Sequence, residues 1–390
     1  MSALLSKRSV RELLCSLGLL LAGLGLVLAP GEAMEGAKTG LELCFNVIIP
    51  SLFPFFVLLA LVVELGLASY LGRVLEPVMR PLFRVNGACA SAVALGFVGG
   101  YPVGARTALS LYEKGLCSKT EAERLLGFCN NSGPAFILGV VGAGVFGDSR
   151  VGLLLYLTHA LASLLVGLLF RFYGGRGERR APSVRPKPIQ TVTLPAAFTG
   201  AVTRSLQSTL NICAFVVFFA VVLRLLAAYG VLSGAAALLS LAGFEGEWAK
   251  RLVAGLLELS SGVASLRGGT ELAGRVSMAA FMLGWAGLSV HCQVLSFLVD
   301  SGLSARVYLA GKLCHGLIAA ALTWGLTRLS PLSAPVADYL VEQTESLAAL
   351  DFSTALAAST LAALAGWLLL AGLCGPLLRK SCGKRVRGGV

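Results

Sequence analysis

The sequence predicts an all-α polytopic membrane protein with about eight transmembrane helices, two re-entrant helical hairpins and an inverted-repeat transporter architecture. Composition is the first reason, because 56% of the 390 residues are hydrophobic, 13% are charged and the mean hydropathy is +0.81. A soluble domain has about 25% charged residues. Matched apolar segments interrupted by Gly and Pro are the second reason. This composition excludes a soluble enzyme, a nucleic-acid-binding protein and a disordered chain.

The net charge of +12 is concentrated in a few loops. The clustered cations are Lys7, Arg8 and Arg11; Arg73, Arg80 and Arg84; Arg171, Arg176, Arg179, Arg180, Arg185 and Lys187; and Arg379, Lys380, Lys384, Arg385 and Arg387. Lysine and arginine gather on the cytoplasmic side of membrane proteins, where the lipid is anionic. The charge therefore indicates a lipid partner and no nucleic-acid partner.

Several uninterrupted apolar runs are long enough to cross a bilayer, which takes about 20 residues. These runs are 13–29, 45–67, 151–170, 205–228, 306–328 and 354–378. The first run follows a basic segment, as a signal peptide does, but the residues around Ala29, Pro30 and Gly31 are poor for cleavage. We expect a retained anchor, with a cleaved signal peptide as the alternative.

Further segments are apolar but interrupted. Residues 87–115 and 252–270 are too short or too rich in Gly to cross and return as ordinary helices, so we expect membrane-entering hairpins. Residues 119–147 and 276–298 are long enough to cross, but polar residues interrupt the middle of each. Unpaired backbone costs several kcal/mol per group in hydrocarbon, so such breaks persist only beside protein or a water-filled cavity.

The same order of segments occurs twice: a full span, an amphipathic stretch, a hairpin, a broken span and a clean span. Paired interruptions at corresponding positions are typical of transporters with inverted repeats. The expected parts are an N-terminal anchor (1–40), a first repeat (41–172), a basic cytoplasmic linker (173–200), a second inverted repeat (201–330), and an acidic extracytoplasmic loop with the last helix and basic tail (331–390).

The positive charges also predict an orientation. If both termini are cytoplasmic, the basic loops after 45–67 and 151–170 and the basic tail all fall inside. The first hairpin then enters from the cytoplasmic face and the second from the opposite face. A few cations fall on the wrong side in this arrangement: Lys250, Arg251, Arg267 and Arg275.

The first hairpin turns at a Gly-rich motif that can bind an anion. Gly100 and Gly104 allow the backbone to approach a ligand, Pro102 ends one helix, and the next helix presents unpaired N–H groups. Arg106 lies one turn into that helix, where a guanidinium can bind a carboxylate through two hydrogen bonds. The alternative is a packing hinge with Arg106 extended to the membrane surface.

A polar run interrupts the first broken span: Asn130, Asn131, Ser132 and Gly133 precede Pro134. Two amides and a hydroxyl at membrane depth are costly unless they contact a substrate, an ion or exposed backbone. Carbonyls freed by the break can also coordinate a cation. An internally satisfied proline kink is the alternative.

The second hairpin carries a carboxylate, Glu258, ahead of Ser261 and Gly262. An intramembrane carboxylate indicates a proton or cation site, which makes Glu258 the candidate for coupling to Na⁺ or H⁺. The alternative is that Glu258 pairs with Arg251 or Arg267.

The second broken span contributes Ser289, His291 and Gln293 as candidate substrate contacts. His291 can bind substrate or relay a proton, and a hydrogen-bonded core histidine is an equal alternative.

The other polar residues of the clean spans are expected to be structural. His159 and His315 lie singly on their spans, whereas Glu64 and Lys312 lie near span ends, where a side chain can extend to the interface. The 10 cysteines show no metal-ligand spacing and are expected to pack as small apolar residues. Catalytic motifs such as GxSxG and HExxH are absent from the sequence, so we expect neither an enzyme nor a cofactor or metal.

Five motifs resemble those of a known family. They are PSLFPF (50–55), MRPLF (79–83), GYPVGA (100–105), FCNNSGP (128–134) and GLSVH (287–291). Across roughly 40–330 the chain resembles the YlbJ-type sporulation integral membrane proteins of endospore-forming Firmicutes. These belong to the nucleoside-recognition (Gate) group, with concentrative nucleoside transporters, the membrane gate of ferrous-iron transporters and spore maturation proteins.

This resemblance implies a protein of the outer forespore membrane that moves dipicolinic acid toward the spore and supports cortex formation. It also implies a central site between two hairpin tips and two broken spans. Dipicolinate is a small planar dicarboxylate, which Arg106 and the adjacent helix start can bind while Tyr101 stacks on its ring. The sodium site of nucleoside transporters has no residue-by-residue counterpart here, so the coupling ion stays open.

Two other functions are alternatives. A non-transporting scaffold that recruits cortex-synthesis proteins would depend on the basic linker and tail, whereas a nucleoside-type transporter would keep the architecture and change the substrate. Broken helices lower stability without benefit to a scaffold, so transport is favoured. Self-association into a homo-oligomer is compatible with each function.

Overall fold

The computed structural model describes residues 7–64, 77–174, 194–241, 243, 245–268 and 271–329. All regular structure within these ranges is helical, which confirms the all-α prediction. Four of the described helices are long and apolar enough to cross a membrane, or six spans if each of two bent helix pairs counts as one. The four are Ser149–Phe170, Pro195–Ala228, Leu272–Leu298 and Ala305–Leu329. The span expected at 354–378 and the basic tail lie outside the described residues, so the total of eight stays a prediction.

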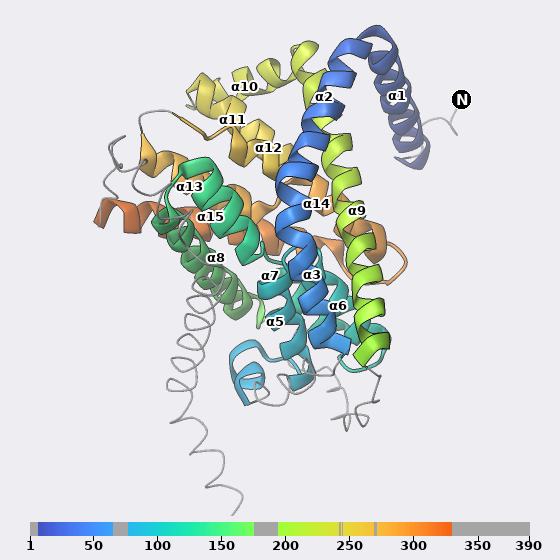
Figure 1. Ribbon diagram of the computed structural model, residues 1–390, viewed down its shortest axis with the longest axis vertical. Helices are drawn as coiled ribbons and strands as arrows, with labels where there is room; N and C mark the ends of the chain where they lie inside the picture. The colour runs from blue at the N-terminus through green and yellow to red at the C-terminus, as the bar shows by residue number, and fades with distance from the viewer. Residues whose placement is uncertain are drawn as a thin grey trace, which may run out of the picture.

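The N-terminal helices lead into one long helical run. The chain bends by 96° between helix α1 (Lys7–Leu28) and helix α2 (Pro30–Leu43), whose first residue is a proline (Figure 1). Proline suits a first helical position because its fixed φ is helical and its missing N–H would have no partner there. A π-helical turn, η2 (Cys44–Ile48), then joins α2 to α3 (Ile49–Glu64).

Helix α9 (Leu194–Ala228) packs along both α2 and α3. Glycines allow this close approach, because a β-carbon on Gly36 or Gly40 would lie only 2.8 Å from the Cα atom of Val221 or Val217, respectively. In Figure 1 the α2–α3 run and α9 stand side by side as the long axis of the molecule.

The first half of the remaining chain contains a hairpin, a broken helix and a long helix. The hairpin is α5 (Ala90–Gly99) and α6 (Val103–Glu113), and the broken helix is α7 (Lys119–Phe128) followed by the π-helix η4 (Ala135–Phe146). Helix α8 (Ser149–Phe170) completes the half. Side chains specify the helix starts: Ser118 and Glu121 form a capping box on α7, and Asp148 caps α8.

The second half has the same order of elements. After α10 (Val231–Leu241), the hairpin is α11 (Gly246–Leu257) with the short α12 (Leu259–Ala264). The broken helix is α13 (Leu272–Trp285) with α14 (Gly287–Leu298), and the long helix is α15 (Ala305–Leu329).

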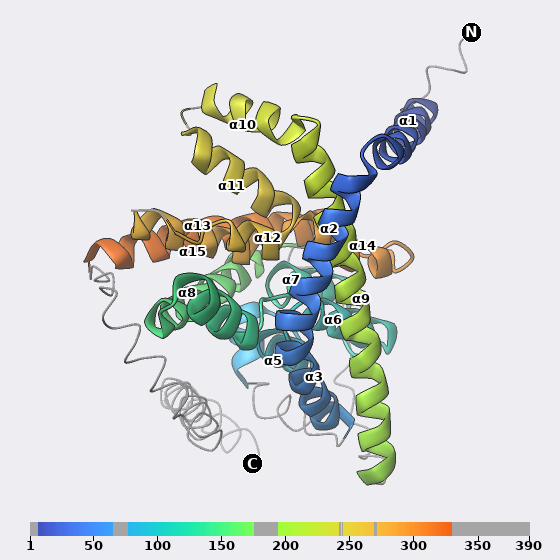
Figure 2. The same cartoon turned by 45° about the horizontal axis from the view of Figure 1, so that its top comes forward.

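Helix α15 connects the two halves, because it packs against α13 of its own half and against α7 and α8 of the first. Its glycines lie directly on backbone: Gly311 contacts Gly127 of α7, and Gly316 contacts Gly284 of α13. Figure 2 shows α13 and α15 running across the α2–α3 and α9 pair. These close contacts fix the depth and rotation of α15 between the halves.

Candidate functional site

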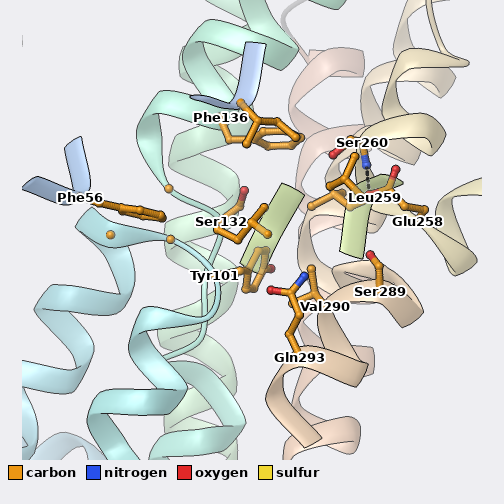
Figure 3. Close-up of a pocket in the computed structure, with 16 residues that line it drawn as sticks. Phe56, Tyr101, Ser132, Phe136, Glu258, Leu259, Ser260, Ser289, Val290 and Gln293 are labelled. Atoms are coloured by element: carbon orange, nitrogen blue, oxygen red, sulfur yellow. Dashed lines mark hydrogen bonds between the residues drawn. The ribbon is translucent and has the colours of Figure 1, made fainter. Parts of the chain in front are cut away.

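A pocket lies where both hairpin tips and both broken helices meet. Its lining residues are Ile48, Phe56, Gly99, Gly100, Tyr101, Ser132, Gly133, Phe136, Ile212, Val216, Glu258, Leu259, Ser260, Ser289, Val290 and Gln293. Figure 3 shows side chains of the first half on one side of this pocket and side chains of the second half on the other. The α2–α3 run and α9 add an apolar wall.

The tip of the first hairpin presses its backbone against the first broken helix. Gly100 has a φ of 71°, and a β-carbon there would lie 2.9 Å from the Gly133 nitrogen and 3.2 Å from its Cα. Glycine is required on both counts, since L-residues rarely adopt this φ and no side chain fits the gap.

The polar run at the first break is buried and only partly hydrogen-bonded. Asn130 Oδ1 accepts from the Ala105 N–H at 3.4 Å, and the Ser132 N–H donates to His159 Nε2 at 3.0 Å. Asn131 is 0% exposed, yet neither its Oδ1 nor its Nδ2 has a hydrogen-bond partner among the described residues. A buried amide without partners costs about 1–3 kcal/mol per group, which favours a binding role at this break over an internally satisfied kink.

Lys312 lies at this break, and the expectation that it extends to the membrane surface is wrong. The residue is 1% exposed, and its Nζ donates to the Asn130 carbonyl at 2.9 Å and to the Tyr101 hydroxyl at 2.8 Å. Tyr101 in turn donates to the Leu283 carbonyl at 2.6 Å. Although Lys312 lies near the end of its apolar run in the sequence, α15 packs with the face that carries Lys312 toward the protein interior, so the side chain is buried.

At the second hairpin tip, Glu258 caps a helix. It is 2% exposed, and its two carboxylate oxygens accept from the N–H groups of Ser260 (3.0 Å) and Ser261 (2.6 Å) at the start of α12. The alternative pairing with Arg251 or Arg267 is not found: the Arg251 guanidinium lies over the Trp248 ring, and Arg267 donates to the Gly144 carbonyl. The carboxylate is therefore satisfied locally.

The second break is a short left-handed turn. Ala286 and Gly287 have φ values of 80° and 78°, and a β-carbon on Gly287 would lie 3.0 Å from the Leu259 nitrogen. Beyond the turn, Ser289 and Gln293 lie one helical turn apart on α14, so both face the pocket. His291 is buried away from the pocket lining, with its Nδ1 3.0 Å from the Tyr308 hydroxyl, which supports the core-histidine alternative.

The structure brings about half of the predicted site residues together. Those that line the pocket are Gly100, Tyr101, Ser132, Gly133, Ser289, Gln293 and Glu258. Those outside its lining are Pro102, Gly104, Arg106, Asn130, Asn131, Ser261, Gly262 and His291. Gly104 has a packing role, because a β-carbon there would collide with the Cys129 carbonyl, and Gly262 likewise lies on the backbone of Gly255.

Arg106 lies outside the pocket lining, so its predicted binding of a carboxylate stays a prediction. Its side chain is exposed, with the guanidinium carbon 5.6 Å from the centre of the Phe297 ring on α14.

Sequence reasoning missed Lys312 and the apolar pocket wall. A lysine inside an apolar run was a usable signal for the first. Phe56, Phe136 and Ile212 carry no signal in the sequence, since an apolar residue that faces the pocket looks the same as one that faces the membrane. The two histidines expected to lie singly stack on each other, with ring centroids 4.3 Å apart and His315 Nε2 2.9 Å from the His159 carbonyl.

Residues 45–170 match the family model described as Gate, nucleoside recognition. The chain is also 33% identical over 366 residues to the sporulation integral membrane protein YlbJ of Bacillus subtilis (strain 168), covering 87% of this chain and 86% of that protein. A further relative, an uncharacterized protein of Alkalihalophilus pseudofirmus, is 25% identical over 190 residues, which cover 42% of this chain and 41% of the relative.

The fold is similar to that of the concentrative nucleoside transporter CNTnw. A variant of CNTnw in an intermediate state gives a TM-score of 0.55 at 16% identity, covering 85% of this chain and 89% of that one. A variant in an outward-facing state gives 0.51 at 13% identity, covering 83% and 88%. The chain is an integral membrane protein with a transporter-like fold, and it belongs to the YlbJ family of sporulation proteins.

Proposed function

We propose that this protein is a secondary transporter that carries a small anion, dipicolinic acid, across the outer forespore membrane during sporulation and thereby supports cortex formation. The observation that carries the proposal is the pocket in which both hairpin tips and both broken helices meet. Interrupted helices around a central site are typical of transporters, because backbone freed at the breaks can bind substrate or ions.

The chemistry of the pocket suits a planar ring with polar substituents. Phe56, Tyr101 and Phe136 offer aromatic surface on the side of the first half (Figure 3). The hydroxyls of Ser132, Ser260 and Ser289 and the amide of Gln293 offer hydrogen-bond donors for carboxylates. Two backbone N–H groups at the start of α12 bind the Glu258 carboxylate and offset part of its negative charge.

The remaining expectations belong to the same proposal. They are eight spans in two inverted repeats, cytoplasmic termini, a basic cytoplasmic linker, self-association, and coupling of uphill transport to Na⁺ or H⁺. Helix order supports the repeats, because hairpin, broken helix and long helix follow one another in both halves.

Counterflow tests the proposal. Proteoliposomes loaded with unlabelled dipicolinate should take up labelled dipicolinate. Ser289→Ala should slow the initial rate about tenfold, because it removes the proposed hydrogen bond from the Ser289 hydroxyl to a substrate carboxylate. Ser233→Ala is the matched control, because Ser233 is exposed on α10, away from the pocket. Counterflow of nucleosides but not dipicolinate would favour the nucleoside-type alternative, and counterflow of neither would contradict transport.

A further inference from the structure

Lys312 is a buried amine without an anionic partner. No described carboxylate forms an ion pair with it, although its side chain is 1% exposed. The titratable groups around it are Tyr101 of the first hairpin, Cys129 after α7, His159 of α8, His291 of α14 and His315 of α15. Moving an ammonium out of water costs several kcal/mol unless other groups replace its hydration, so this position calls for a functional reason.

The groups that replace the hydration of Lys312 are those that bind an inorganic cation. The Asn130 carbonyl, freed by the helix break, accepts from Nζ at 2.9 Å, and the Tyr101 hydroxyl accepts at 2.8 Å. The ammonium also lies 4.7 Å from the centre of the Tyr101 ring, within cation–π range. Unwound carbonyls at helix breaks are the usual ligands of coupling ions in transporters.

Glu258, the residue expected to couple transport to an ion, is less suited to this role. Both of its oxygens already accept backbone N–H groups of α12, so protonation of Glu258 would weaken the cap of that helix. The chain thus places an amine, not a carboxylate, where the first helix break meets the first hairpin tip.

We propose that Lys312 is the coupling cation of the transport cycle, attached to the protein, and that protons and not sodium drive uphill transport. This inference rests on the transport function proposed above. The protonated amine holds the first hairpin tip, through Tyr101, to the broken helix at Asn130. Release of one proton to water on the side toward which the pocket opens leaves a neutral amine, which no longer attracts the ring and carbonyl as strongly, and the tip can separate. Rebinding of a proton from the other side restores the contact.

The anchoring of α15 supports this role. Gly311 and Gly316, on either side of Lys312, contact the backbones of Gly127 and Gly284. With its helix held this closely, the amine stays in place, and a change in its charge acts on the hairpin tip and not on the position of α15.

Proteoliposomes containing the full chain test the proposal, with the membrane potential clamped by potassium and valinomycin and with protein-free liposomes subtracted. An imposed gradient of about one pH unit should change dipicolinate accumulation by up to about tenfold per coupled proton, whereas a sodium gradient at equal pH should have no effect. Lys312→Met, which keeps the side-chain volume, should lose the response to pH. Its counterflow without a gradient should also fall about tenfold, because the hydrogen bonds to Tyr101 and Asn130 are lost.

Lys250→Met is the control, because Lys250 is exposed and pairs with Glu247 far from the break; it should keep the full pH response. Acceleration of the wild type by sodium would overturn the coupling proposal, as would a pH response that survives in Lys312→Met. The wild-type measurement decides even if Lys312→Met fails to fold. Absence of wild-type counterflow is a different failure, because it would contradict transport itself.

Discussion

The two hairpin tips are held in opposite ways. At the first tip, Tyr101 and the Asn130 carbonyl receive their partners from distant elements: Lys312 of α15 donates to both, and Tyr101 donates to Leu283 of α13. At the second tip, Glu258 bonds the two N–H groups that follow it in the chain. The first tip therefore depends on contacts between elements, and the second is stable within its own turn.

The two helix breaks differ in the same sense. The first runs from Cys129 to Pro134 and leaves the Asn131 amide without described partners, whereas the second is a two-residue turn at Ala286 and Gly287. Contacts between elements can be made and broken during a conformational cycle, while a local cap persists. We expect the first hairpin and break to change during transport and the second to act as a fixed support.

The largest effect should come from Gly100→Ala. A β-carbon at Gly100 would meet the Gly133 backbone at 2.9 Å and force an L-residue into φ 71°, so the tip cannot close on the break. Counterflow should fall about a hundredfold. Gly115→Ala is the control for strain alone, since Gly115 has a φ of 66° with nothing within 4 Å. Equal losses in the two variants would contradict a specific contact at the first tip.

Removal of the Glu258 cap should mainly reduce stability. Glu258→Ala leaves the Ser260 and Ser261 N–H groups unpaired, which should lower the free energy of unfolding by about 1–3 kcal/mol. Thermal unfolding in detergent measures the loss, with the exposed Glu247→Ala as control.

Tyr101→Phe should slow transport about tenfold, because the hydrogen bonds it loses join the first tip to Lys312 and Leu283 of other helices. Normal counterflow by Tyr101→Phe would contradict a role for these contacts in the transport cycle.

Asn131→Ala should slow counterflow without destabilising the protein. The buried amide has no described partner to lose, so the unfolding temperature should stay the same or rise, while transport falls about tenfold if the amide bonds a ligand or a transient state. Asn46→Ala, at an exposed position of η2, should leave both quantities unchanged. Normal transport by Asn131→Ala would show that the unpaired amide of Asn131 has no role in the transport cycle.

The smallest effect is expected for Arg106→Ala. Its guanidinium lies over Phe297 outside the pocket lining, so counterflow should change by about twofold or less. A tenfold loss would instead restore the role that the sequence suggested for this residue.

The helix breaks could be predicted from the sequence because their signals are local. Pro102, the run from Asn130 to Pro134, and Gly287 each disrupt a helix through missing N–H groups, polar side chains or backbone freedom, and the structure breaks the helices at those residues.

The direction in which side chains point could not be predicted, because it depends on how the helices pack. Arg106 lies over the Phe297 ring outside the pocket lining, and Lys312 is buried since glycines fix α15 against α7 and α13. The local sequence predicts neither arrangement, although a lysine inside an apolar run marks position 312 as unusual. The apolar wall, including Phe56 and Ile212, was equally hidden, because membrane-facing and pocket-facing apolar residues look alike.

Equilibrium binding of labelled dipicolinate to the purified protein tests most directly whether this pocket is the substrate site. Gln293 lines the pocket, whereas Gln207 is exposed on α9 outside it. We predict saturable binding by the wild type, a Kd raised about tenfold by Gln293→Leu, and a Kd unchanged by Gln207→Leu. Wild-type affinity in Gln293→Leu, or no saturable binding by the wild type, would contradict this prediction.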